Sequence, residues 1–288
     1  MQDFSIGTTL HTITHAGRER RYLVHLPPMY DRNQRWPLVF SFHGSNSNGQ
    51  TQLEFTDINP LADREGFIVI YPFGTGDRER LRFWNAGNCC GYPVEHDVDD
   101  VGFIRSLLDH LQSTLSIHQK RIYATGMSNG GMFAYRLANE MADTFAAIAP
   151  VAGVMGFAHA NPARPVSVIH FHGSDDEFVP IDGGVGKQSV TGTSHFSLQY
   201  TIDQWRQANH CPAEPVSVTL PSKTDHTTTI RTTYGPGDEG TEVVLYLVEG
   251  AGHTWPGRPP RPHYLGHSTN SFSANAVMWE FFCRHART

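Results

Sequence analysis

The sequence predicts an α/β fold in which helices cover both faces of a mostly parallel central β-sheet. Short apolar runs bounded by turn residues alternate along the chain with longer amphipathic segments. Such alternation of strands and helices is typical of a parallel sheet. The 288 residues contain 39% hydrophobic and 17% charged side chains, without an internal repeat or a Pro/Gly-rich linker. We therefore expect one globular domain over residues 1–288.

The predicted strands are short and mostly apolar. The first, at 20–26, alternates polar and apolar residues, as a half-buried strand does. The others are continuous apolar runs of the kind that the interior of a parallel sheet contains. They lie at 37–42, 67–71, 121–125, 145–150, 166–171 and 243–248.

The clearest predicted helix covers residues 97–115. Its N-terminal end carries Asp97, Asp99 and Asp100, where the helix dipole favours negative charge. Apolar side chains repeat along one face at helical spacing. They are Val98, Val101, Ile104, Leu108, Leu111 and Leu115. Further helices are predicted at 57–65, 129–139, 195–208 and 274–285, the first of them ended by Gly66.

Charge and hydropathy exclude two classes of partner. The net charge of −6, from 28 acidic and 22 basic residues, argues against a nucleic-acid binder, which would present a basic face. No run of about 18 apolar residues predicts a membrane helix. Residues 1–4 lack the basic and apolar regions of a signal peptide. A cytoplasmic location and export with the signal already removed are both compatible with that start.

The four cysteines include an adjacent pair, Cys89 and Cys90. A vicinal bridge, or a bridge from one of them to Cys211 or Cys283, would suit an oxidising compartment. Four ordinary thiols are the alternative. Spacing alone does not decide the connectivity.

A candidate nucleophile follows the strand predicted at 121–125. Gly126-Met127-Ser128-Asn129-Gly130 is a G-x-S-x-G motif between that strand and the next predicted helix. In the α/β-hydrolase fold this motif forms a sharp turn that exposes the serine hydroxyl at the sheet edge. The pentapeptide alone is a weak signal, but its strand–turn–helix context makes it specific. Ser128 is therefore the predicted nucleophile.

A serine of ordinary acidity needs a general base, and the base needs an orienting acid. In α/β-hydrolases the acid follows the serine along the chain and the histidine comes last. Asp175 and Asp176 follow the strand predicted at 166–171, and His253 lies on a glycine-rich loop after the last strand. Position and chain order predict His253 as the base and leave the two aspartates as alternative acids.

The remaining part of such a site is an oxyanion hole made of backbone N–H groups. Phe42-His43-Gly44-Ser45 ends the strand whose following loop should supply one N–H group, and Asn129 should supply the other. The side chains of His43 and His172 are expected to be packing residues at strand ends.

Together these segments resemble the secreted polyhydroxybutyrate depolymerase and feruloyl esterase group of carbohydrate esterase family one, over about residues 20–283. The segments that carry the resemblance are F-H-G-S at 42–45, G-M-S-N-G-G at 126–131, H-G-S-D-D-E-F-V-P at 172–180 and G-H-T-W-P-G at 252–257. W-N-A-G-N-C-C-G at 84–91 and V-D-D-V-G-F-I at 98–104 are similar to the same group.

The resemblance implies a Ser-His-Asp triad in a single catalytic domain. Because members of the group carry H-G-x-x-D-x-x-V-P, it places the acid at Asp176 rather than Asp175. Ser45 and Asn129 would be the oxyanion donors. Ile181 stands where many relatives carry tyrosine, which affects the lining of the pocket. The resemblance also favours a secreted or periplasmic location.

We therefore expect a serine carboxylic ester hydrolase that works through an acyl-enzyme, most similar to a feruloyl (hydroxycinnamoyl) esterase. Trp84 and Trp255 are predicted walls for an aromatic or sugar-bearing substrate. A polyhydroxybutyrate or other polyester depolymerase and an acetyl xylan esterase are the alternatives. Neither the natural ester nor the oligomeric state follows from the sequence.

Two hypotheses from other classes compete with this one. In a metal-dependent hydrolase, His170 and His172 would share one strand face with Asp175 and Asp176 close behind. No second ligand cluster accompanies them, so no metal or other cofactor is predicted. A non-catalytic carbohydrate-binding relative is disfavoured by the intact triad.

Overall fold

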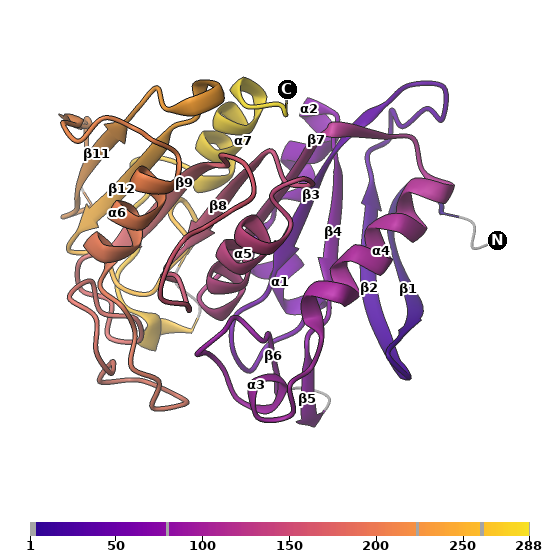
Figure 1. Ribbon diagram of the computed structural model, residues 1–288, viewed down its shortest axis with the longest axis horizontal. Coiled ribbons are helices and arrows are strands. Elements are labelled where there is room, and N and C mark those ends of the chain that lie inside the picture. Colours follow the sequence, from indigo (N-terminus) through magenta and orange to yellow (C-terminus); the bar gives the residue numbers. More distant parts are fainter. Residues whose placement is uncertain (1–3, 79–80, 223–224, 260–261, 288) are drawn as a thin grey trace.

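The centre of the molecule is one twisted sheet. In the computed structural model, which describes residues 4–78, 81–222, 225–259 and 262–287, the sheet has ten strands in the order β1-β2-β4-β3-β7-β8-β9-β12-β11-β10 (Figure 1). The six strands from β4 to β12 run parallel, and an antiparallel pair continues the sheet at each edge. The predicted fold class is confirmed.

The strands have the following bounds. The sheet comprises β1 Gly7–His15, β2 Arg18–Leu26, β3 Trp36–Phe42, β4 Ile68–Pro72, β7 Ile117–Met127, β8 Ala147–Val151, β9 Ser167–Gly173, β10 Val216–Thr219, β11 Thr228–Tyr234 and β12 Val243–Glu249. A separate hairpin pairs β5 Thr75–Arg78 with β6 Leu81–Phe83.

Seven α-helices lie within the described residues. They are α1 Gly49–Thr56, α2 Asn59–Glu65, α3 Tyr92–Glu95, α4 Asp100–Thr114, α5 Asn129–Glu140, α6 Leu198–Ala208 and α7 Ala274–Arg284. None of the helices in this described part is both long and apolar enough to cross a membrane.

Alternation along the strands gives the sheet two cores. Along β3, Leu38 and Phe40 pack into the cluster that contains apolar side chains of α4, α5 and α6. Val39 between them packs into the cluster of α2 and α7. Successive side chains of a strand point to opposite faces, so one apolar run serves both layers. Figure 1 shows α4, α5 and α6 together on one face of the sheet.

Every predicted strand and helix is present, with shifted ends. The helix predicted at 57–65 corresponds to α2, and a further helix, α1, precedes it. Asp57 ends α1 with a left-handed backbone conformation, φ 51°. The helix predicted from residue 97 begins at Asp100, because the side chain of Asp99 accepts a hydrogen bond from Gly102 N and caps it. The strands that were not predicted include the edge strands β1 and β10 and the strand β11 beside β10.

Candidate active site

Ser128 lies in the sharp turn between β7 and α5. Its backbone has φ 56° and ψ −123°, a region that side-chain-bearing residues rarely occupy, and its N–H donates to Val151 O at 2.8 Å. The turn needs the flanking glycines. A Cβ on Gly126 would lie 2.5 Å from the carbonyl group of Gly130, and one on Gly130 would lie 2.3 Å from Phe42 O. The backbone thus forms the turn that the motif predicts for a nucleophile.

The two predicted oxyanion donors flank this turn. Asn129 opens α5, so its N–H is one of the first helical N–H groups, which have no acceptor within the helix. The loop after β3 passes beside the serine, because a Cβ on Gly44 would lie 3.4 Å from Ser128 Cβ. Ser45, the next residue, lines the same pocket as Ser128.

The side chain of Asn129 forms hydrogen bonds with the backbone of Trp84. Its Oδ1 accepts from Trp84 N at 2.7 Å, and its Nδ2 donates to Trp84 O at 3.0 Å. This pair of bonds fixes the 84–91 segment against the start of α5.

His43 forms hydrogen bonds to the loop after β3 and to the loop after β4. Its Nδ1 donates to Gly44 O at 2.7 Å and its Nε2 accepts from Gly74 N at 2.9 Å. Burial lowers the pKa of His43 to about 3, so the imidazole is neutral and keeps both roles. It was expected only to pack, but it also ties two loops together.

Asp176 is the buried aspartate of the loop after β9. Its Oδ2 accepts from His253 Nδ1 at 2.7 Å, and its Oδ1 accepts from the N–H groups of Phe178 and Val179, each at 2.8 Å. Burial by itself would raise the pKa of Asp176. The imidazole of His253 and the hydrogen bonds from His172 and His253 outweigh it and hold that pKa well below its usual range.

Its neighbour Asp175 lies in a different environment. That side chain is exposed and accepts a hydrogen bond from Ser174 Oγ at 2.7 Å. Of the two aspartates, only Asp176 has a hydrogen bond to His253 among the described residues. The two aspartates that chain order left as alternatives therefore differ in burial and in hydrogen bonding.

The loop that carries His253 is held by backbone hydrogen bonds to residues further along the chain. Its N–H donates to Leu265 O at 2.7 Å, and the preceding Gly252 N–H donates to His267 O at 2.9 Å. The loop therefore folds back on a second segment, 265–271, in addition to its contacts with the end of β9.

That second segment is anchored by Asp225, a buried aspartate just before β11. Its carboxylate accepts from Thr269 Oγ1 at 3.0 Å, from Asn270 N at 2.8 Å and from Ser271 Oγ at 3.2 Å. Its own carbonyl lies 2.5 Å from His267 Nε2. Sequence analysis missed Asp225, because nothing near it in the chain marks a partner about 45 residues away.

Ser128 and His253 line one pocket of about 270 Å³. Around them the lining is largely apolar and includes Phe55, Phe178 and Tyr264. The ring of Phe178 packs 4.9 Å from that of His253, centroid to centroid. The described residues therefore bring the predicted nucleophile, base and acid to one place, with aromatic side chains beside them.

The structure contradicts the prediction that Trp84 and Trp255 form the walls of this pocket. Both indoles are at most 1% exposed, and neither is among the described residues that line it. Trp84 stacks on Phe133 at 5.0 Å in the core, and Trp255 Nε1 donates to Asn275 Oδ1 at 2.8 Å. Large apolar rings are stabilised most by complete burial, and each indole N–H has an internal acceptor.

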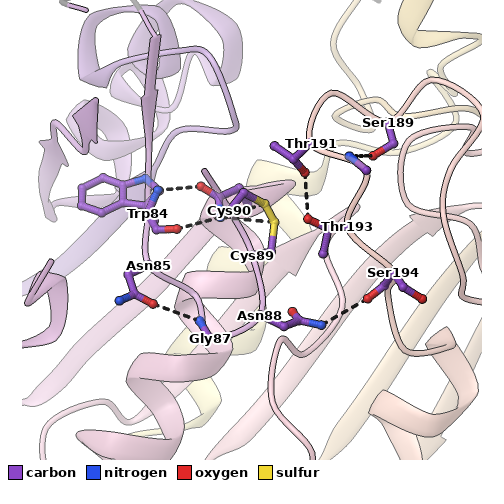
Figure 2. Close-up of a disulfide and its surroundings, with 12 residues drawn as sticks. Trp84, Asn85, Gly87, Asn88, Cys89, Cys90, Ser189, Thr191, Thr193 and Ser194 are labelled. Atoms are coloured by element: carbon purple, nitrogen blue, oxygen red, sulfur yellow. Dashed lines mark hydrogen bonds between the residues drawn. A yellow bond between two sulfur atoms is a disulfide. The ribbon is translucent and has the colours of Figure 1, made fainter. Parts of the chain in front are cut away.

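The structure pairs Cys89 with Cys90, one of the alternatives that spacing left open. Figure 2 shows this disulfide between the Trp84 segment and the segment that carries Thr191 and Thr193. Both cysteines line the pocket. Cys211 and Cys283 are thiols, the first buried and the second exposed.

No group of three or more His, Cys, Asp or Glu side chains within the described residues is arranged to hold a metal ion. His170 and His172 do share one face of β9, but their rings stack 5.2 Å apart and hydrogen-bond to each other instead.

The solved structures that resemble this chain share its fold. An acetyl xylan esterase from Aspergillus awamori superposes with a TM-score of 0.61 at 16% identity, over 85% of this chain and 94% of that one. A feruloyl esterase module from Clostridium thermocellum, complexed with sinapinate, gives 0.55 at 16% identity, over 86% and 82%. At these identities the likeness shows the α/β-hydrolase fold.

Sequence comparison adds the family. A putative esterase, NocK, of Nocardia uniformis subsp. tsuyamanensis is 30% identical over 95% of this chain and 82% of its own length. A bifunctional acetylxylan esterase/xylanase of Neocallimastix patriciarum is 30% identical over 76% of this chain, and feruloyl esterase B of Piromyces equi 27% over 81%. The matches span only 29% and 42% of those two proteins. Residues 20–208 match the model of the esterase PHB depolymerase family. The chain belongs to this family of carboxylic ester hydrolases, as the motifs predicted.

Proposed function

We propose that this carboxylic ester hydrolase works through an acyl-enzyme, with Ser128 as nucleophile, His253 as general base and Asp176 as the acid that orients it. The observation that carries the proposal is the 2.7 Å hydrogen bond from His253 Nδ1 to the buried Asp176, because His253 lines the same pocket as Ser128. Because Nδ1 donates to the carboxylate, Nε2 of the neutral imidazole is left to accept a proton.

The chemistry follows from these roles. The Ser128 oxygen adds to the ester carbonyl while its proton moves to His253 Nε2, and the carbonyl oxygen becomes an oxyanion. Backbone N–H groups of Ser45 and Asn129 stabilise that oxyanion, each by about 3 kcal/mol in the barrier. The tetrahedral intermediate then collapses: the bond from the carbonyl carbon to the alcohol oxygen breaks as the imidazolium protonates that oxygen, and the alcohol leaves. Water, activated by the same imidazole, hydrolyses the acyl-enzyme and releases the acid.

We also propose that the acyl group is a short aromatic acid such as a hydroxycinnamate. With the two tryptophans buried elsewhere, the aromatic surfaces at the pocket are Phe55, Phe178 and Tyr264. Stacking on such rings adds about 1 kcal/mol to the burial of a flat acyl group. The names of two relatives, a feruloyl esterase and an acetylxylan esterase, are compatible with this class and with acetate.

A side-by-side assay tests both parts. We expect methyl ferulate to be cleaved with higher kcat/KM than p-nitrophenyl decanoate or hydroxybutyrate oligomers, and Ser128→Ala to lose turnover on every ester. p-Nitrophenyl acetate measures the alternative acetyl specificity. Preference for acetate or for decanoate would refute the aromatic pocket but leave the triad intact. An active Ser128→Ala enzyme would refute the triad itself.

We further propose that the described chain acts as one catalytic domain in an exported protein. The Cys89–Cys90 disulfide supports export, because such bonds persist in oxidising compartments. Thiol titration of the unfolded, unreduced protein purified from its natural source should then find two thiols, Cys211 and Cys283. Four thiols, together with recovery of the protein in the cytosol, would contradict export.

A further inference from the structure

Behind Asp176 lies a continuous chain of buried polar side chains that the proposed mechanism does not use. Tyr135 Oη lies 2.8 Å from His170 Nδ1, and His170 Nε2 lies 2.9 Å from His172 Nδ1. His172 Nε2 lies 2.8 Å from Val179 O and 3.3 Å from Asp176 Oδ2. Tyr135 and His170 are completely buried, and His172 is 2% exposed.

When both imidazoles are neutral, the partners fix the direction of every hydrogen bond in this chain. Val179 O and the Asp176 carboxylate only accept, so His172 Nε2 carries the proton and shares it between them. In a neutral His172, Nδ1 then accepts, so the proton of His170 lies on Nε2. His170 Nδ1 is left to accept from the hydroxyl of Tyr135. One set of tautomers satisfies all four residues, and each donor points towards Asp176.

The elements explain why these side chains meet. His170 and His172 are two residues apart on β9, so both point to the same face of the sheet, where α5 packs. Tyr135 lies on α5, the helix that begins just after Ser128. The chain of bonds therefore links the helix of the nucleophile to the loop of the acid.

Burial of these groups in the core would be unfavourable without a complete set of partners. Burial, and then the neighbouring His172, lower the pKa of His170 well below its usual range, which keeps that imidazole uncharged. An uncharged His170 adds no positive charge to the chain of hydrogen bonds that orients the Asp176 carboxylate.

We propose that Tyr135, His170 and His172 are positioning residues that set the orientation and the basicity of Asp176, and through it those of His253. The inference rests on the proposed triad. His172 acts at two points of the acid loop, on Val179 O and on Asp176 Oδ2, while Val179 N donates to the other carboxylate oxygen. The loop and its carboxylate are thus held as a unit.

The other titratable side chains that face this unit are His253, from the loop after β12, and His195, from the segment before α6. Burial lowers the pKa of His195 to about 4, against the opposing charge of Asp176. His195 therefore stays neutral over the range in which the esterase is assayed.

The test is the pH dependence of kcat/KM for p-nitrophenyl acetate in a graded series. His172→Leu removes the donor to Asp176, so negative charge concentrates on the oxygen that faces His253 and stabilises the imidazolium. We expect the acidic limb to move to higher pH by about half a unit to one unit, and kcat to fall about tenfold. Tyr135→Phe, which deletes one hydroxyl at the far end, should shift the limb in the same direction by a smaller amount. His172→Gln keeps an amide donor near the position of Nε2, so its acidic limb should lie close to that of the wild type.

His25→Leu is the matched control. His25 is also a buried histidine of the sheet with an aspartate partner, because its Nε2 lies 2.9 Å from Asp63 Oδ1, but it belongs to β2 and does not line the pocket. Its loss should lower thermal stability and leave the acidic limb in place.

The proposal is overturned if folded His172→Leu and Tyr135→Phe proteins keep the wild-type limb, since a purely structural role lowers stability without moving it. If His172→Leu does not fold, Tyr135→Phe decides alone, and a wild-type limb in that variant overturns the proposal. Failure of the triad is recognised separately, because a serine-directed phosphonate would then not label Ser128 in the wild-type protein. In that case both proposals are wrong.

Discussion

The two halves of the candidate active site are built in different ways. The nucleophile half is local: Ser128 and its glycines lie within residues 126–131, between a strand and a helix that pack directly on each other. The histidine half is assembled from distant parts of the chain. His253 depends on Leu265, on His267 and, through them, on Asp225.

The difference shows which kinds of support can be recognised in a sequence. Where two backbone segments lie so close that a Cβ atom would clash, only glycine fits. This requirement appears in the sequence as a fixed motif. A loop held by hydrogen bonds to distant carbonyls and carboxylates leaves no such pattern, because many residue types can donate or accept. The predictions below test the two halves separately.

The largest contrast is expected between the two adjacent aspartates. Asp176→Asn should lower kcat by about 10⁴-fold, because an amide no longer holds the His253 tautomer or stabilises the imidazolium. Asp175→Asn, on an exposed side chain, should change kcat by less than about threefold. Steady-state kinetics of the two purified variants measure this. A crippled Asp175→Asn enzyme would show that the acid is assigned to the wrong residue.

The nucleophile half should be intolerant of a single methyl group. In Gly130→Ala the added Cβ would lie 2.3 Å from Phe42 O and 2.5 Å from His43 O, so the turn must shift. We expect the free energy of unfolding to fall by about 3 kcal/mol. Most of the esterase activity should be lost as well. Gly131→Ala, whose Cβ would come no closer than 3.0 Å to another atom, should cost less. Urea denaturation of both variants compares them, and equal stability of Gly130→Ala and wild type would contradict the close packing of the turn.

The histidine half should respond to the loss of its anchor without unfolding. Asp225→Asn removes a carboxylate oxygen that accepts from Thr269, Asn270 and Ser271, so the segment behind His253 loosens. We expect kcat to fall about tenfold and the melting temperature at neutral pH to fall as well, while the protein stays folded. Thr227→Val, which removes only one donor to Asp225, should have a smaller effect of the same kind. An unchanged kcat in Asp225→Asn would separate this anchor from catalysis.

The same anchor predicts a pH dependence. Burial alone would raise the pKa of Asp225, but the hydrogen bonds from Thr227 and Asn270 hold it below its usual range. A carboxylate with a lowered pKa in the folded state stabilises the protein above its ordinary pKa, about 3.9, and loses that effect as the pH falls further. Wild type should therefore lose more stability than Asp225→Asn between pH 4 and pH 2. Parallel losses in thermal melts over that range would contradict the role of the carboxylate.

The smallest effect concerns the pocket. Phe178→Ala removes an aromatic surface beside His253 and should raise KM several-fold for methyl ferulate, but little for p-nitrophenyl acetate, whose acyl group touches less of the wall. If KM changes equally for the two esters, Phe178 does not determine the acyl specificity.

Much of this molecule could be predicted from its sequence. The central strands are apolar because they are buried on both faces, and the helices alternate with them, so the fold class followed. The edge strands β1 and β10 were missed. Strand β1 alternates half-buried and exposed residues and β10 is exposed throughout, so both contain few apolar residues or are too short to form a clear pattern.

The candidate site was predicted unevenly for the same physical reason. Ser128 and His253 followed from motifs and chain order. The prediction that Trp84 and Trp255 form the pocket walls was wrong, because an aromatic residue close to a catalytic motif along the chain can still point into the core. His172 was expected only to pack, since its bond to Asp176 depends on how one loop folds back over β9.

The most direct test of the account is covalent labelling of the wild-type enzyme with a serine-directed phosphonate, followed by peptide mass spectrometry. We expect a single adduct on the peptide that contains Ser128, in step with complete loss of esterase activity, and no adduct in Ser128→Ala. His253→Ala should react far more slowly, because the hydroxyl then lacks its base. Labelling of a different residue, or inactivation of Ser128→Ala at the wild-type rate, would contradict the proposed serine mechanism.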